Sequence, residues 1–165
     1  MKRLIAFMGP LAFLLVLSLS FVSAGKAAVK LTPLEELGKR LFFDKNLSNP
    51  AGQECAACHG PATGFTGSDE AINKTGGVYE GAVKGRFGNR KPPAAAYAGE
   101  SPKLHQGDDG KFIGGMFWDG RATGETLNDP LAEQALGPFL NPREHNMPDK
   151  KAVVTAVQKL SLIHI

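Results

Sequence analysis

The chain has 165 residues, of which 42% are hydrophobic and 21% are charged, and it contains 20 Gly, 11 Pro and two Cys. This length suits one domain with its own core, the apolar content argues against disorder, and two Cys exclude a disulfide-dense scaffold. The formal charge of +3 includes Lys2 and Arg3; without them 17 basic side chains face 16 acidic ones. A strongly basic nucleic-acid-binding protein is therefore excluded, and no nucleic-acid partner is expected.

Residues 1–24 have the pattern of a secretory signal peptide. Lys2 and Arg3 precede an uncharged apolar run from Leu4 to Val22, and small residues that end at Ala24 suit cleavage there. An uncleaved membrane anchor is the alternative, because the run approaches the roughly 20 residues that span a bilayer, although Gly9-Pro10 interrupts it. We expect export to the periplasm and a mature domain over residues 25–160.

The predicted elements begin with a helix that Thr32 caps, with Pro33 in its first turn and Glu35 completing a capping box. This helix should end before Asn49-Pro50, because a residue that precedes proline avoids helical backbone angles. Residues 50–70 are predicted to form a loop with one helical turn. Residues 71–115 lack periodicity and are predicted to form a long irregular loop, which is a feature of functional segments.

Two further helices are predicted. One covers residues 124–137 and ends at Gly137-Pro138, and the other opens at Pro148-Asp149. The last helix should bury Val153, Val154, Val157 and Leu160. No segment alternates convincingly as a strand does. Residues 161–165 end the chain without a cap or polar tail, so we expect a truncated domain with a doubtful tail.

The strongest motif is Cys55-Ala56-Ala57-Cys58-His59, the C-x-x-C-H attachment pattern of c-type haem. Two thiols at this spacing can each form a thioether with one vinyl group of the same porphyrin. His59 then ligates the iron, so it is the expected metal ligand. A bound haem would also supply part of the core, which explains a sparse apolar inventory.

Three other interpretations of the cysteine pair remain. A redox disulfide lacks its usual βαβ setting in this sequence, and a zinc site lacks a second Cys pair. A simple structural disulfide is the third. The motif together with the expected export favours haem over all three.

A second group of residues follows, and it begins with the tryptophan segment Phe117-Trp118-Asp119-Gly120-Arg121-Ala122. Glu133-Gln134-Ala135, Gly137-Pro138 and Asn141-Pro142-Arg143-Glu144 come after it. Taken alone, Trp118 would be a core residue beside a surface ion pair, and Glu144 would be a turn residue. Their order together with the haem motif carries more information than either residue alone.

This order resembles the bacterial di-haem cytochrome c peroxidase family, including its MauG-type members. The resemblance covers roughly residues 31–160. It rests on Leu31-Thr32-Pro33, Leu37 to Asp44, Asn49 to Gln53, the haem motif, Gly64-Phe65-Thr66, Gly88-Asn89-Arg90, Pro93 and the tryptophan segment with the residues after it. It implies a mainly α, cytochrome-c-like haem domain with long irregular loops. This would be the N-terminal half of a longer protein, with one covalent haem c here and a second haem in the missing half.

The resemblance also implies roles for individual residues. His59 matches the proximal ligand of the peroxidatic haem, and Trp118 matches the tryptophan between the two haems. Gln134 and Glu144 match the distal-pocket glutamine and the acid–base glutamate. Arg90 matches an arginine in the loop over the haem. Catalytic roles are therefore expected for Glu144, Gln134, Trp118 and Arg90, and haem attachment at Cys55, Cys58 and His59.

The sequence departs from the family pattern at two points. No His lies between His59 and Arg90, where many members have a removable iron ligand; Thr75 is nearest in spacing, so we expect an open distal face, with His105 as a less favoured replacement. Lys91 stands where the family often has a calcium-binding Asn. Lys cannot ligate calcium, so calcium is doubtful.

The sequence thus predicts a periplasmic oxidoreductase that reduces hydrogen peroxide to water. Its electrons would come from a small donor such as a c-type cytochrome or a cupredoxin, and the full-length protein could be a homodimer. One alternative is a mono-haem electron carrier in which Met116 or Met147 ligates the iron. Another is a MauG-type oxidase that modifies a partner protein.

Overall fold

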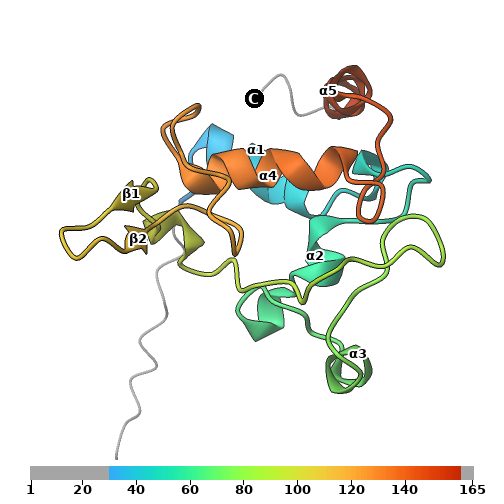
Figure 1. Ribbon diagram of the computed structural model, residues 1–165. Helices are drawn as coiled ribbons and strands as arrows, with labels where there is room; N and C mark the ends of the chain where they lie inside the picture. The colour runs from blue at the N-terminus through green and yellow to red at the C-terminus, as the bar shows by residue number, and fades with distance from the viewer. Residues whose placement is uncertain (1–29, 161–165) are drawn as a thin grey trace, which may run out of the picture. The chain divides into compact units, whose positions relative to one another are not determined.

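The computed structural model describes residues 30–160, and from Leu31 onward they belong to one compact unit (Figure 1). The predicted signal peptide and the doubtful tail lie outside these residues. The helices are α1 (Pro33–Phe42), α2 (Cys55–Cys58), α3 (Glu70–Lys74), α4 (Pro130–Leu140) and α5 (Lys150–Lys159), the 3₁₀ turns are η1 (Lys45–Leu47), η2 (Pro61–Thr63) and η3 (Ala98–Glu100), and the strands are β1 (His105–Gln106) and β2 (Phe112–Ile113).

Helix α1 starts as its sequence predicts. The Thr32 hydroxyl accepts the Glu35 backbone N–H at 3.3 Å, and the Glu35 carboxylate accepts the Thr32 backbone N–H at 2.7 Å. The capping box is therefore complete, and Pro33 occupies the first turn, where its missing N–H does no harm. The helix ends at Phe42, and a separate turn, η1, fills the stretch before Asn49-Pro50.

The central part of the chain is mostly irregular, as predicted, with one helical turn at α2. The prediction of no strands is wrong for one small hairpin, in which His105 pairs with Ile113 and Gln106 pairs with Phe112. Each strand has two exposed residues, which is too short for hydrophobic alternation to be detected. In Figure 1 this hairpin lies at the edge of the unit, away from α2.

Helix α4 differs from the prediction at both ends. It begins at Pro130, where the Asp129 side chain accepts the Leu131 and Ala132 backbone N–H groups. It also continues through Pro138 to Leu140, instead of ending at Gly137. The carbonyls of Pro138 and Phe139 accept the backbone N–H groups of His145 and Met147, so the following segment completes the hydrogen bonds of the last turn.

Helix α5 begins after its cap, Asp149, as predicted. Val153, Val157 and Leu160 are partly buried, but Val154 is 53% exposed, so its predicted burial is wrong. Ala152 and Ala156 lie on the inner face instead. Helix α5 packs against the short turn η1, and a narrow apolar stripe is enough for this contact.

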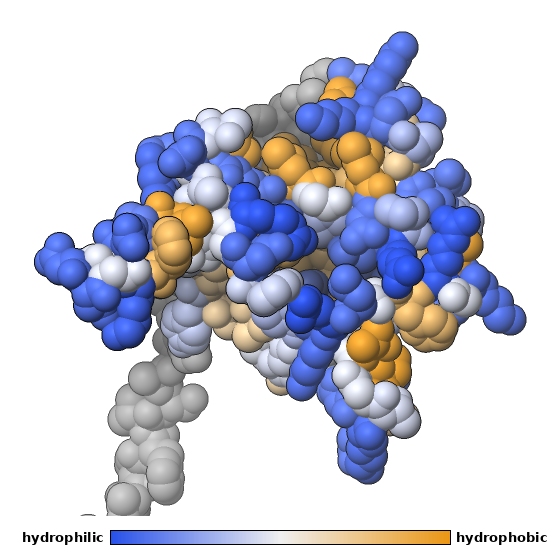
Figure 2. Space-filling view, viewed as in Figure 1, coloured by the Kyte–Doolittle hydropathy of each residue, from blue (hydrophilic) through white to orange (hydrophobic). Residues whose placement is uncertain are grey.

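The core of the described unit is small. Its buried apolar side chains are Leu47, Tyr79, Ala122 and Met147, of which Leu47 is fully buried. Other apolar side chains stay on the surface, among them Leu136 and Leu140 of α4, and Figure 2 shows apolar surface above this helix. The mainly α fold with long loops matches the prediction. Among residues 30–160, no helix has the length and hydropathy needed to cross a membrane.

Candidate functional site

The haem motif occupies one helical turn. Helix α2 runs from Cys55 to Cys58, and the backbone N–H of His59 closes it by donating to the Cys55 carbonyl at 2.9 Å. Because residues three positions apart share a face of a helix, both thiols are presented on the same side. Both cysteines are unpaired and partly buried. The predicted motif is thus organised as a pair of adjacent thiols followed by an imidazole.

The imidazole of His59 is oriented by a backbone carbonyl. Its Nδ1 lies 2.9 Å from the Phe65 carbonyl oxygen, which can only accept, so Nδ1 carries the proton and Nε2 keeps its lone pair. Phe65 is held for this role by its left-handed backbone (φ 59°) and by its N–H, which donates to the Gly60 carbonyl at 2.9 Å. This second-sphere bond fixes the tautomer that a metal requires.

The electrostatic surroundings keep both thiols protonated. Burial raises the pKa of the Cys55 thiol to about 11, and the Glu144 carboxylate adds to the rise. Burial also raises the pKa of the Cys58 thiol to about 11, again with Glu144 contributing. The Glu144 carboxylate therefore acts on both thiols, although it lies more than 80 residues further along the chain.

A tight turn holds Glu144 in place. The Asn141 side chain donates to Glu144 Oε1 at 2.6 Å and accepts the Arg143 backbone N–H at 3.0 Å. The Glu144 backbone N–H donates to the Asn141 carbonyl at 3.0 Å, and its carbonyl accepts the Ala82 N–H at 2.7 Å. Glu144 is thus both a turn residue and a neighbour of the haem motif. Its interpretation as a turn residue is confirmed, and its acid–base role stays a prediction.

The next residue, His145, is a further buried residue beside the haem motif. Only 3% of it is exposed. Its Nδ1 lies 2.8 Å from the Leu47 carbonyl and its Nε2 lies 3.8 Å from Cys55 Sγ. No sequence signal identifies these contacts, because each joins segments about 90 residues or more apart.

Gln134 lies in the middle of α4 and is partly buried. Its neighbour Glu133 accepts backbone N–H groups from Leu127, Gly124 and Thr126, which lower the pKa of that carboxyl. Glu133 therefore ties the preceding loop to the helix that carries Gln134. Within residues 30–160, no hydrogen bond joins Gln134 to Glu144, so their expected pairing in one pocket stays a prediction.

Trp118 and Arg90 lie together in the structure. The Arg90 guanidinium lies over the Trp118 ring, 4.2 Å from its centroid. Trp118 is 73% exposed, so it is not the core residue that the alternative interpretation would require. The adjacent ion pair between Arg121 and Asp119, at 2.7 Å, lies on the surface.

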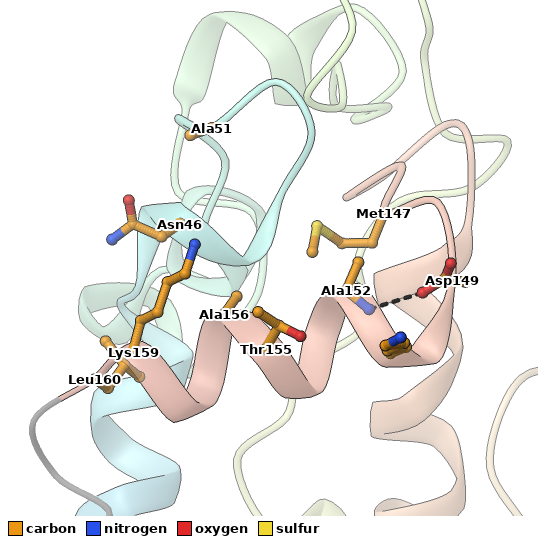
Figure 3. A pocket seen from close by; sticks show the side chains of 10 residues that line it. Asn46, Ala51, Met147, Asp149, Ala152, Thr155, Ala156, Lys159 and Leu160 are labelled. Atoms are coloured by element: carbon orange, nitrogen blue, oxygen red, sulfur yellow. Dashed lines mark hydrogen bonds between the residues drawn. The ribbon is translucent and has the colours of Figure 1, made fainter.

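The alternative iron ligands lie in other surroundings. His105 is exposed on the small hairpin and its Nδ1 bonds to the Lys103 carbonyl at 2.9 Å. The Thr75 hydroxyl donates to carbonyls of its own helix, α3. Met147 lines a pocket of about 750 Å³ between α5 and the segment around η1 (Figure 3). The lining of this pocket does not include the haem motif, so the pocket is separate from the proposed site of chemistry.

The donor set fits a c-type haem. The two protonated thiols lie on one turn, and His59 offers Nε2 as a neutral ligand. A tetrahedral zinc centre would need further ligands, and among residues 30–160 no group of three or more His, Cys, Asp or Glu is placed to hold a metal ion.

Comparison with known proteins agrees with this geometry. The family model for di-haem cytochrome c peroxidase matches residues 32–163. The chain is 43% identical over 126 residues to the methylamine utilization protein MauG of Paracoccus denitrificans, a match that covers 76% of this chain and 30% of MauG. It is 34% identical over 114 residues to the cytochrome c551 peroxidase of Pseudomonas aeruginosa, covering 68% of this chain and 25% of the peroxidase.

A solved structure shows the same architecture. The diheme peroxidase BthA of Burkholderia thailandensis superposes with a TM-score of 0.69 at 33% identity, covering 82% of this chain and 34% of BthA. The chain therefore spans about a third or less of the length of these relatives. The fold, the haem motif and the family model agree, and this chain belongs to the di-haem cytochrome c peroxidase family.

Proposed function

We propose that this chain is the peroxidatic haem domain of an exported oxidoreductase that reduces hydrogen peroxide to water. The observation that carries the proposal is the position of the Glu144 turn: the next residue, His145, has its Nε2 3.8 Å from Cys55 Sγ, and the Glu144 carboxylate helps to raise the pKa of both thiols. An acid–base group would thus lie close to the segment proposed to bind haem. Family membership supports the oxidoreductase class.

Cys55, Cys58 and His59 would hold the haem. The thiols would form thioethers, and His59 Nε2 would ligate the iron while Nδ1 stays bonded to the Phe65 carbonyl. When bound, the haem would supply redox-active iron to the site. The other residues of the site are proposed to move protons, to orient peroxide and to carry electrons.

Glu144 has the chemistry for proton movement. Peroxide is protonated at neutral pH, so cleavage of its O–O bond needs a proton taken from one oxygen and delivered to the other. A carboxyl group can do both. Asn141 donates to Glu144 Oε1, and no side-chain hydrogen bond within residues 30–160 involves Oε2. Oε2 is therefore free to exchange a proton. Gln134 could orient peroxide by hydrogen bonding but cannot accept its proton.

Trp118 and Arg90 are proposed to serve electron entry. The indole is exposed, and the stacked guanidinium holds the ring in one orientation. An exposed, fixed aromatic ring suits contact with a second redox centre, which we propose is the second haem. A small donor such as a c-type cytochrome or a cupredoxin would supply the electrons.

Replacing Glu144 tests the proposal directly. Glu144→Gln keeps an oxygen for the Asn141 bond and removes the base. The rate at which the haem-loaded ferric protein reacts with hydrogen peroxide should fall by about 10²–10⁴-fold, measured by stopped-flow absorbance.

Glu54→Gln is the matched control. Glu54 caps α2 without a side-chain hydrogen bond, and its carboxylate also raises the pKa of Cys55. This variant removes the same charge next to the haem motif and should stay within about threefold of the wild-type rate. A Glu144→Gln rate within that range would remove Glu144 from the mechanism. Equal losses of rate in both variants would show that Glu144 contributes only its negative charge and not proton transfer.

Oxidation of a protein partner is a second candidate, which the 43% identity to MauG favours. The two functions share their first steps and differ in the source of electrons. Rapid peroxide consumption that depends on a small reduced donor selects the peroxidase. Consumption that depends on a protein partner, with a mass change in that partner, selects the oxidase.

A further inference from the structure

The buried imidazole of His145 contacts a reacting atom of the haem motif. Its Nε2 lies 3.8 Å from Cys55 Sγ, and its ring packs edge-on against Phe139 with centroids 5.4 Å apart. With 3% of the residue exposed, solvent competes weakly for this contact. Nothing in the proposed peroxide chemistry uses this group.

The tautomer of His145 follows from its other nitrogen. Nδ1 lies 2.8 Å from the Leu47 carbonyl, which can only accept a hydrogen bond, so Nδ1 carries the proton. In the neutral ring Nε2 is then an acceptor that faces the Cys55 thiol. The S–H group can donate to it, within the longer range that sulfur allows.

Cys58 has a neighbour of the opposite kind. The Gln53 amide N–H lies 3.5 Å from Cys58 Sγ and 3.3 Å from the Glu80 carbonyl. An amide N–H donates and cannot take a proton. The two thiols of the motif therefore differ: Cys55 faces a base, and Cys58 faces a hydrogen-bond donor.

We propose that His145 is the general base for attachment of haem to Cys55, an inference that rests on the proposed binding of haem c. His145 Nε2 takes the thiol proton, and the sulfur forms a bond to one carbon of a haem vinyl group. The imidazolium then returns the proton to the other vinyl carbon. One S–H bond and the vinyl π bond are lost, one C–S and one C–H bond are gained, and no oxidant or reductant is consumed.

A base is needed at this position because the thiol is a weak acid there. The Cys55 side chain is partly buried, and burial disfavours the charged thiolate. Thiolate is the nucleophilic form of cysteine. A neighbouring imidazole can supply it at the moment of attack.

Chains with a single cysteine isolate the two attachments. Cys58→Ala leaves Cys55 with its base, and Cys55→Ala leaves Cys58 as the internal control for folding and haem uptake. Each single-cysteine chain is kept reduced, mixed anaerobically with ferrous protoporphyrin IX, and sampled over time. Denaturation followed by mass spectrometry gives the fraction with covalent haem.

Two His145 variants are then compared in both chains. His145→Asn places an N–H near the Nδ1 position, so the bond to Leu47 is kept and the base is removed. His145→Gln reaches toward Cys55 with a polar atom that is not a base. In the chain with Cys55 alone, both variants should slow attachment by about 10²-fold. In the chain with Cys58 alone, both should leave the rate within about twofold, because no proton is transferred to His145 there.

The outcomes separate the two proposals. Equal slowing in both chains, or no slowing in either, would overturn the base role of His145. Attachment at the unchanged rate by His145→Gln in the chain with Cys55 alone would also overturn it, because a hydrogen bond to the thiol would then suffice. If no chain, including the one with both cysteines, forms a thioether, the haem proposal itself fails.

Discussion

At the scale of single residues, the thiols of Cys55 and Cys58 show how position changes chemistry. Both lie on the short helix α2 and are shielded from water, which disfavours the charged thiolate, and the Glu144 carboxylate acts in the same direction. The same two residues in an unfolded chain would titrate near their ordinary value of 9.0.

The pH dependence of thiol alkylation tests whether folding raises the pKa of both cysteines. In the reduced chain before haem attachment, the rate of reaction with iodoacetamide should rise with an apparent pKa of about 11. Because folding favours the protonated thiols, their contribution to the free energy of unfolding is complete below about pH 9 and is lost as the pH rises through about 11. The same chain in denaturant is the control, and a native pKa near 9 would contradict the burial.

Gly81 is a second residue whose role depends on position. A Cβ atom there would collide with the backbone carbonyls of Arg143 and Glu144. Gly81→Ala should therefore displace the turn that carries Glu144, and lower the free energy of unfolding by about 1–3 kcal/mol, the usual effect of overpacking. Chemical denaturation of the haem-loaded protein measures this.

Gly88→Ala is the control for that variant, since a Cβ at Gly88 would meet its neighbours at an ordinary distance of 3.7 Å or more. It should change stability by less than about 0.5 kcal/mol. Equal stability of the two variants would mean that residues 81 and 143–144 are not packed as described.

At the scale of elements, α1 is the helix whose start depends most on local sequence. Its capping box satisfies two backbone N–H groups, and none of its own residues is fully buried. Thr32→Ala should lower the free energy of unfolding by about 1 kcal/mol because the Glu35 N–H loses its acceptor. Thr32→Ser should restore most of the loss, and a Thr32→Ala protein as stable as wild type would show that packing alone holds α1.

Helices α2 and α4 depend on their partners instead. Helix α2 has only four residues, too few to be stable alone. Helix α4 passes through Pro138, whose ring disfavours helix continuation, yet extends to Leu140 because His145 and Met147 donate to its last carbonyls. This tertiary bonding also brings the Glu144 turn to the haem motif.

At the scale of the whole molecule, the small core predicts a strong dependence on haem. Leu47, Tyr79, Ala122 and Met147 are few buried apolar side chains for a unit of this size. The double variant Cys55→Ala, Cys58→Ala should lose covalent haem and unfold without a cooperative transition, followed by circular dichroism on heating.

The wild-type chain from a host with haem-maturation machinery is the reference. Its mass should exceed that of the polypeptide by one haem, and this increase should survive denaturant and acid–acetone extraction. Loss of haem on extraction would refute thioether attachment. Cooperative unfolding of the double variant would show that side chains alone complete the core.

Local patterns in the sequence were sufficient for several features. The capping box of α1, the helical turn at the motif and the start of α5 each depend on a few neighbouring residues, and all three are present in the structure. The mainly α fold also follows, because long loops and helical spacing leave little room for a sheet. The predicted end of α4 was wrong because its last carbonyls accept from His145 and Met147, and the hairpin was missed because its two-residue strands are too short for alternation to be detected.

The sequence by itself determined the type of chemistry, because C-x-x-C-H places two thiols and an imidazole within five consecutive residues. Only the tertiary structure decided which groups surround them. Phe65 sets the tautomer of His59, Glu144 acts on both thiols, and His145 faces Cys55, each through a contact specified by chain folding. The physical reason is that backbone carbonyls and burial, which no residue type reveals, control where protons reside at this site.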